Sequence, residues 1–183
     1  MTILQGVVVA EPIRAAASLG YGSFEEYVTL RSSALLRFAA LITGNREDAH
    51  DAVQDALAGL YPKWARVSAS GQVDAYVRRS IVNAHVSAWR KVRRLHVVED
   101  PAELRAAPTI ADASTALADA DQAARLCREL PPQQRAAVVL RFYEDRSFAE
   151  IGTILGCPEA TARSHVHRAL VALRARLEGG RDE

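Results

Sequence analysis

Apolar residues recur every three or four positions along most of this chain, which is the spacing of residues on one face of an α-helix. After the first 22 residues, no segment alternates apolar and polar residues convincingly, as a half-buried β-strand would. The pattern therefore predicts an all-α fold. The expected helices cover 23–42, 46–61, 73–95, 133–143, 147–155 and 159–176, with a further helical start near 117.

Capping and turn residues mark several of the expected helix ends. Ser23 and Ser147 are each followed three residues later by a glutamate, the spacing of a capping box that satisfies free backbone N–H groups. Gly156 stands where a helix end favours a left-handed residue, and Pro158 suits the first turn of the next helix. Residues 147–176 are therefore expected to form two helices joined by a short turn.

The chain is expected to form two small helical domains joined by an acidic linker. The best linker candidate is rich in Ala, Asp, Pro and Thr and includes Pro101 and Pro108. The opening segment lacks the basic start and cleavage pattern of a signal peptide, so a mobile tail is expected there. The expected boundaries are 1–22 for this tail, 23–96 for the first module, 97–116 for the linker, 117–178 for the second module and 179–183 for a C-terminal tail.

The distribution of charge is more informative than its total. The formal net charge is only +1, which does not by itself indicate a nucleic-acid partner. However, residues 76–95 contain six basic side chains and no acid, whereas residues 97–124 contain six acids and one arginine. Two patches of opposite sign therefore cancel in the sum but not in space.

The helix pair at 147–176 has the pattern of a helix-turn-helix. The second helix carries an apolar stripe on one side, and small or cationic residues near its start on the other. Such residues let a helix approach a DNA groove and its phosphates, although an ordinary helical hairpin with a solvated basic face gives the same pattern. The candidate duplex-binding residues are Ala160, Thr161, Arg163, Ser164, His167 and Arg168.

The helix expected at 73–95 carries a second basic face. Guanidinium groups contact phosphates, an amide can read a base edge, and an aromatic ring can stack on an unpaired base. The run contains all three kinds of group, which favours nucleic acid over a merely solvated surface. The candidate residues on this face and its flank are Arg79, Asn83, Val86, Trp89, Arg90, Arg93 and Arg94.

The helix expected at 46–61, which Pro62 should end, has the opposite polarity. Its outward face is acidic, and carboxylates there serve either solubility or docking on a basic protein surface. The residues on this face are Glu47, Asp51, Gln54 and Asp55.

Enzymatic and metal-binding functions find little support in the sequence. Cys127 and Cys157 form neither a disulfide framework nor a zinc spacing, and they fit a reducing cytoplasm. His165 and His167 lie about 200° apart on a helix, so one ion cannot easily bridge them. Neither a phosphate-binding glycine loop nor a nucleophile elbow occurs, and no apolar run reaches membrane-spanning length. We therefore expect no catalysis, cofactor, metal, small-molecule substrate or membrane partner.

A basic, Asn-bearing helix, a linker and a C-terminal helix-turn-helix together resemble the extracytoplasmic-function (ECF) group of bacterial sigma factors, within the sigma-70 family and in the style of its actinobacterial members. The matching stretches, which cover most of residues 24–177, are FEEYVTLRSSALLRFAALITGNREDAHDAVQDALAGLYPKW, YVRRSIVNAHVSAWRKVRRL and LPPQQRAAVVLRFYEDRSFAEIGTILGCPEATARSHVHRAL.

The resemblance implies a role for each face. The first module would be sigma region 2, with the acidic face docking on core RNA polymerase and the basic face holding the minus-ten element. A loop at 66–74 would receive a flipped-out base. The second module would be sigma region 4, whose 159–176 helix reads the minus-thirty-five element. The implied function is that of an alternative, cytoplasmic sigma factor that opens promoter DNA. The sequence leaves open whether an anti-sigma factor also binds.

This chain departs from the family pattern at the start of the 159–176 helix. The usual run is Ser-x-Gly-Thr-Val-Lys, and here it is Pro158-Glu-Ala-Thr-Ala-Arg163. The missing N-cap hydroxyl should cost about 1 kcal/mol of helix-start stability, and Ala162 thins the hairpin core. A conventional helix-turn-helix regulator, which binds duplex DNA without polymerase, is the main alternative function. It leaves the basic helix with Asn83 and Trp89 unexplained.

Overall fold

The computed structural model describes residues 20–96 and 125–179, and side chains within 20–91 and 125–178. The expected linker and nearly all of both expected tails lie outside these ranges. In the described residues every regular element is a helix, so the predicted all-α fold is confirmed.

The first module begins with two long helices, α1 (Phe24–Thr43) and α2 (Arg46–Leu60). Ser23 caps α1 by accepting from the Glu26 N–H at 3.1 Å, while the Glu26 carboxylate accepts from the N–H of Gly22. Gly44 then ends α1 with a left-handed φ of 76°, and Asn45 caps α2. Two consecutive residues thus end one helix and begin the next.

The prediction of a loop at 66–74 is wrong over much of this stretch. A 3-10 turn η2 (Tyr61–Lys63) leads directly into a short helix α3 (Trp64–Ala69), and α4 (Val73–His96) begins after a turn at Gly71. Pro62 is tolerated at the start of the 3-10 turn because its missing N–H has no partner to lose there. Inward packing of Trp64 and Val67 stabilises the extra helix.

The second module contains α6 (Pro132–Val138), a π-helical turn η4 (Val139–Tyr143), α7 (Phe148–Leu155) and α8 (Glu159–Gly179). The predicted capping box at Ser147 and Glu150 is confirmed, as is the left-handed Gly156. Pro158 lies one position earlier than expected: its carbonyl accepts from the Ala162 N–H, so it precedes the helix. Leu177, near the C-terminal end of α8, is exposed.

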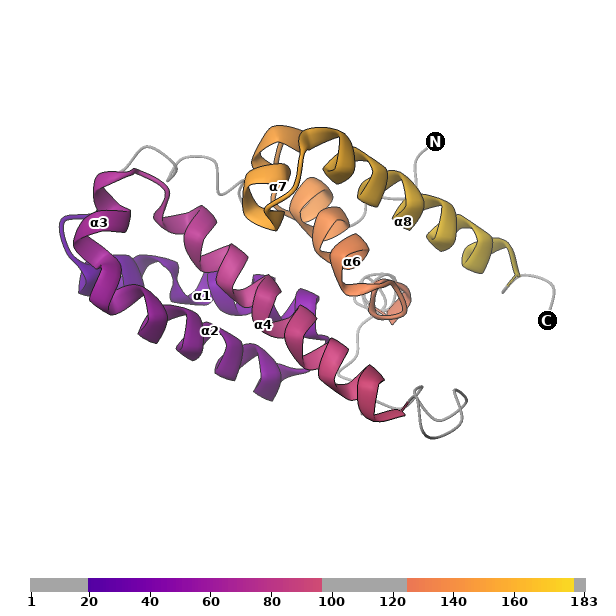
Figure 1. Ribbon diagram of the computed structural model, residues 1–183, viewed down its shortest axis with the longest axis horizontal. Coiled ribbons are helices and arrows are strands. Elements are labelled where there is room, and N and C mark those ends of the chain that lie inside the picture. The colour runs from indigo at the N-terminus through magenta and orange to yellow at the C-terminus, as the bar shows by residue number, and fades with distance from the viewer. Residues whose placement is uncertain (1–19, 97–124, 180–183) are drawn as a thin grey trace, which may run out of the picture.

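The two modules pack against each other along α4, which lies between α1 and α2 on one side and α6 and α7 on the other (Figure 1). One continuous apolar core includes residues of both modules. Among the described helices, none is long and apolar enough to cross a membrane.

Candidate nucleic-acid and protein interfaces

The α8 basic face, comprising the candidate residues 160–168 defined above, lies on the side of α8 away from α6 and α7. Ala162, Val166 and Ala169 are buried against those helices, which turns the opposite side outward. Ala160, Arg163, His167 and Arg168 are exposed, while Thr161 and Ser164 are half-buried. Ser164 donates to the carbonyl of Ala160 at 2.9 Å, so its hydroxyl is engaged within the helix.

Close packing supports the turn before α8. A Cβ added to Gly152 would lie 2.7 Å from the backbone oxygen of Cys157, so only glycine lets α7 and the turn approach this closely. Arg163 is positioned by an ion pair to Glu159 at 2.8 Å and by the ring of Phe148, 4.9 Å from its guanidinium carbon. Arg141 lies over the same ring at 5.1 Å. Two guanidinium groups are therefore held beside the helix-turn-helix.

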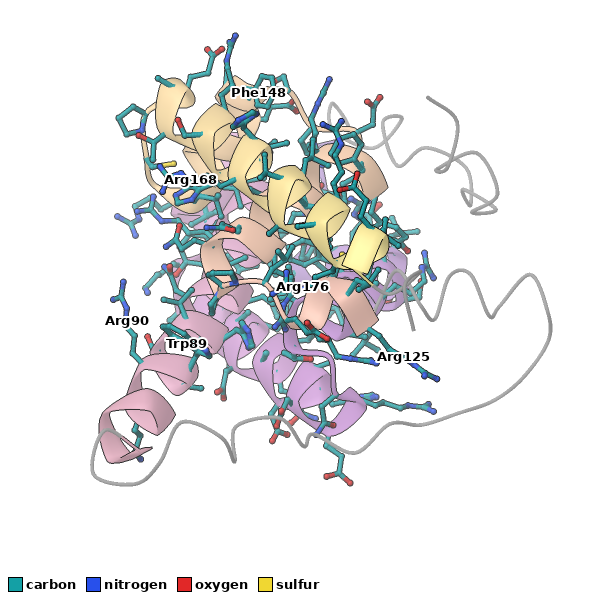
Figure 2. The ribbon with its side chains drawn as sticks, turned by 90° about the vertical axis from the view of Figure 1, so that its right-hand side faces the viewer. Trp89, Arg90, Arg125, Phe148, Arg168 and Arg176 are labelled. Carbon is teal, nitrogen blue, oxygen red and sulfur yellow. The ribbon has the colours of Figure 1, made fainter. Side chains whose placement is uncertain are left out.

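The α4 basic face is only partly as predicted. Arg79, Asn83 and Arg90 are exposed, and Trp89 is half-buried on the flank of the helix. Figure 2 shows Arg90 of α4 and Arg168 of α8 projecting on the same side of the molecule. The side chains of Arg93 and Arg94 lie outside the described residues.

Val86 was expected on the outward face of α4 and is buried, with only 6% exposed. Arg78, Val82 and Val86 are spaced by four residues, so they share one side of the helix. Arg78 pairs with Glu144 of the second module, which shows that this side faces that module. Docking of the second module therefore removes Val86 from the exposed α4 basic face, while Ala88 is exposed.

The α2 acidic face, Glu47, Asp51, Gln54 and Asp55, is exposed at all four positions. The opposite side of α2 is buried through Ala49, Ala52, Val53 and Ala56. The backbone N–H of Glu47 donates to the capping side chain of Asn45 at 2.8 Å, which leaves its carboxylate on the outward side. The face is therefore available to a protein partner.

A partly buried ionic network centred on Asp74 was missed by the sequence analysis. Asp74 accepts from Arg31 at 3.1 Å and from Arg78 at 3.0 Å. The hydroxyls of Tyr21 and Tyr27 donate to the same carboxylate. Burial, followed by the charge of Asp74, raises the pKa of Tyr27 far above its usual value, so this phenol stays a hydrogen-bond donor.

The network continues from α4 into the second module. The fully buried guanidinium of Arg78 donates through Nε and Nη2 to both carboxylate oxygens of Glu144, with the Nη2 contact at 2.8 Å. Burial lowers the pKa of Arg78, but the charge of Glu144 outweighs it, and the pKa is raised overall. The sequence contained a signal for this second buried side of α4, because the apolar residues Val82 and Val86 follow Arg78 at intervals of four positions.

Arg135 crosses between the modules in the reverse direction. Its guanidinium donates to the carbonyl of Ile42 in the last turn of α1 at 2.7 Å, and to the carbonyls of Arg128 and Leu130. Burial lowers its pKa to about 10. Ile42 is in the last turn of α1, where carbonyls lack intrahelical donors, so the arginine also caps that helix.

Among the described residues, no cluster of three or more His, Cys, Asp and Glu could hold a metal ion. His165 and His167 do not form a cluster of this kind. The arrangement thus offers charged surfaces, and an interface between modules that combines ion pairs with an apolar core.

Comparisons with known proteins identify the family. Residues 24–95 match the family model described as sigma-70 region 2, and residues 120–173 match that described as sigma-70 region 4. The chain is 37% identical to the RNA polymerase sigma-E factor of Streptomyces avermitilis over 155 residues, which cover 85% of each protein. It is 30% identical to the ECF RNA polymerase sigma factor SigM of Mycobacterium tuberculosis, covering 86% of this chain and 78% of the relative.

A solved structure has a similar fold. The sigma factor RpoE of Bartonella quintana, in complex with the anti-sigma factor NepR, superposes with a TM-score of 0.70 at 25% identity. The superposition covers 85% of this chain and 96% of that one, so it includes both modules. From its two family matches and its relatives, this chain belongs to the ECF sigma factors of the sigma-70 family.

Proposed function

We propose that this protein is an alternative sigma factor that binds core RNA polymerase in the cytoplasm, recognises a promoter and assists strand opening. The observation that best supports the proposal is that the α2 acidic face and the α4 basic face are both exposed on one module. The two surfaces have opposite charge and therefore suit different macromolecules. Sigma factors are transcription initiation factors rather than enzymes, and no covalent step is needed here.

The α2 acidic face would dock on polymerase. Four exposed polar side chains on one side of a helix, with two carboxylates at positions 51 and 55, complement a basic protein surface.

The α4 basic face would hold the separated strand of the minus-ten element. Arg79 and Arg90 would contact phosphates, and Asn83 would read a base edge. Arg93 and Arg94 extend the basic sequence. Trp89 lies on the flank, where an aromatic ring can stack on an unpaired base. Tighter binding of single-stranded than of paired bases would shift the melting equilibrium towards the open promoter.

The α8 basic face would read the minus-thirty-five element in the major groove. Its small residues permit close approach, and the ring of Phe148 holds Arg163 beside the start of the helix. Two binding modules on one chain gain affinity through effective concentration. We also propose an anti-sigma partner, because a solved relative is bound to one.

The test is run-off transcription with purified bacterial core polymerase, combined with co-purification of polymerase. The double variant Asp51→Arg, Asp55→Arg should abolish both, because it reverses the charge of the docking face while leaving the buried side of α2 intact. A matched control is Glu25→Arg, Glu178→Arg, which makes the same change in net charge at exposed positions elsewhere.

Undiminished co-purification by the α2 double variant would remove the docking assignment. Tight, specific binding of duplex promoter by the protein alone, together with failure to initiate with core polymerase, would instead favour a conventional helix-turn-helix regulator.

A further inference from the structure

The ring of Phe148, the first residue of α7, contacts two arginines from different segments of the second module. Arg141 belongs to η4, and its guanidinium carbon lies 5.1 Å from the ring centroid. Arg163 belongs to α8, and its guanidinium carbon lies 4.9 Å from the same centroid. A guanidinium within about 6 Å of an aromatic ring is attracted by the electrons of the ring. One side chain therefore brings together two cations that lie far apart in sequence.

Further contacts orient both guanidinium groups. Nη1 of Arg141 donates to the backbone carbonyl of Arg146 at 2.9 Å. That oxygen carries no formal charge, so the contact holds the guanidinium without neutralising it. Nη2 of Arg163 donates to Oε1 of Glu159 at 2.8 Å, in a pair whose side chains are 63% and 52% exposed. Each of these bonds uses one of the five N–H groups of a guanidinium, so both arginines keep donors for a ligand.

Folding stability alone does not explain why Arg163 is held in place. An ion pair this exposed contributes little to folding, and holding a long side chain in one conformation costs entropy. A side chain that is already ordered, however, loses less entropy when it binds a ligand. This chain also has arginine at position 163, where the family pattern described above has lysine. A planar guanidinium stacks on a ring and binds a phosphate through two N–H groups, whereas an ammonium does neither as well.

The position of this cluster in the motif indicates its ligand. In a helix-turn-helix the first helix crosses the DNA backbone, while the start of the second helix enters the major groove. Phe148 begins the first of these helices, α7, and Arg163 lies in the second turn of α8. Two like charges held beside one ring repel each other, and an anion that contacts both relieves the repulsion. The anion that meets this part of the motif is a phosphate of the DNA backbone.

We propose that Arg141, Phe148 and Arg163 form a phosphate clamp, in which the two arginines contact the DNA backbone beside the minus-thirty-five element and Phe148 positions them. The clamp adds affinity that does not depend on base sequence. This inference rests on the proposed function for its DNA ligand, while the clamp itself is measured separately with inorganic phosphate.

The first experiment measures promoter binding by the full chain in complex with core polymerase, at several salt concentrations. Phe148→Leu keeps an apolar side chain at this half-buried position but removes the ring. It should weaken binding to the complete promoter about tenfold and reduce the slope of log affinity against log salt by about one. Arg141→Gln should reduce the slope by a similar amount, whereas Arg37→Gln, the same change at an exposed position of α1, should not. On a promoter fragment that lacks the minus-thirty-five element and the duplex upstream of it, all these chains should bind equally.

Two further variants separate positioning of the arginines from general packing. Phe148→Tyr retains the ring and should bind within about twofold of the unaltered chain. Arg163→Lys retains the charge but stacks poorly, so it should weaken binding about fivefold alone and little more once Phe148→Leu is present. If the ring acted through packing alone, its loss would lower the unfolding temperature but leave the salt slope unchanged, and the two losses of affinity would multiply. Thermal unfolding of each variant is therefore measured as well.

The second experiment tests the clamp without polymerase or DNA. The full chain is titrated with inorganic phosphate while NMR records the Nε–H signals of its arginines, with sodium chloride at equal ionic strength as the control. The signals of Arg141 and Arg163 should shift together with one dissociation constant, and Phe148→Leu should abolish this shared response. The proposal is overturned if phosphate moves neither signal, or if Phe148→Leu leaves the salt slope of promoter binding unchanged. A shared phosphate response in a chain that binds no promoter with core polymerase would instead support the clamp and reject the proposed function.

Discussion

α4 and α8 are both long helices rich in arginine, but they are packed differently. α8 buries one side against α6 and α7 of its own module and turns its basic side outward. α4 is packed on two sides, against α1 and α2 and against α6 and α7, which leaves it a narrower exposed strip. The arginines of α4 therefore divide into a buried structural residue, Arg78, and exposed residues such as Arg79 and Arg90. One cationic helix thus carries both an exposed basic strip and the contact between the modules.

The largest expected difference between the two helices is in folding stability. Arg78→Met should lower the free energy of unfolding by about 3 kcal/mol, because it leaves the carboxylate of Glu144 buried without its main partner. Arg90→Met and Arg168→Met, at exposed positions, should change it by less than about 0.5 kcal/mol. Urea titration followed by circular dichroism measures all three. Similar stabilities for the three variants would contradict the division of roles on α4.

Substitutions of the exposed residues should instead affect promoter binding by the polymerase complex. Asn83→Ala should cost about 1–3 kcal/mol at one base of the minus-ten element and much less on promoters altered at that base. Arg90→Ala should weaken all promoters similarly and reduce the salt dependence by about one phosphate contact. Arg168→Ala should act through the minus-thirty-five element, with Arg174→Ala, further along α8, as its control. Equal losses on every promoter for Asn83→Ala would argue against base readout.

His85 on α4 is expected to make folding stability depend on pH in the acidic range. Burial, and then the nearby charge of Arg135, lowers its pKa to about 4. The unfolded chain therefore takes up a proton below about pH 6.5, whereas the folded chain does so only near pH 4. Stability should fall by roughly 2 kcal/mol between these values, after allowance for partial exposure. His85→Gln should flatten this part of the profile in urea titrations at several pH values, whereas the exposed His50→Gln should not. If His85→Gln leaves this slope unchanged, the pH dependence of stability comes from other groups.

The smallest expected effect concerns the start of the helix-turn-helix. Ser147→Ala removes the hydroxyl that accepts from the Glu150 N–H at 3.2 Å and should cost about 1 kcal/mol. Partial burial raises the pKa of Glu150, but hydrogen bonds from Ser147 and Arg146 lower it overall, so the variant should also bring this pKa nearer to its usual value. Thermal unfolding and titration by NMR test both effects. Thr153→Ala on the same helix is the control and should be nearly neutral.

The sequence predicted the helices that bury one side better than it predicted α4, which is packed on two sides. The outward position of Arg168 and of the α2 acidic face follows from one apolar stripe on each helix. For α4 the same argument assigned Val86 to the solvent side and counted Arg78 as a surface cation, because the residues that cover them lie about 60 positions away in sequence. The stretch 66–74 was expected to be a loop, whereas residues 64–69 form a helix that depends on packing of Trp64 and Val67. A composition typical of a linker also gave no indication that the modules it joins would touch.

The π-helical turn at Val139–Tyr143 has a consequence for the spacing of the second module. The N–H of Glu144 donates to the carbonyl of Val139, five residues back, so this turn contains one residue more than an α-helical turn. Deleting one residue of the turn would restore ordinary helical phase and rotate everything beyond it by about 100°. The Glu144 carboxylate would then point away from α4, and α8 would lose its packing position against α6. A single-residue deletion should thus disturb both the contact between the modules and the packing of the second module, without altering any residue of the α4 or α8 basic face.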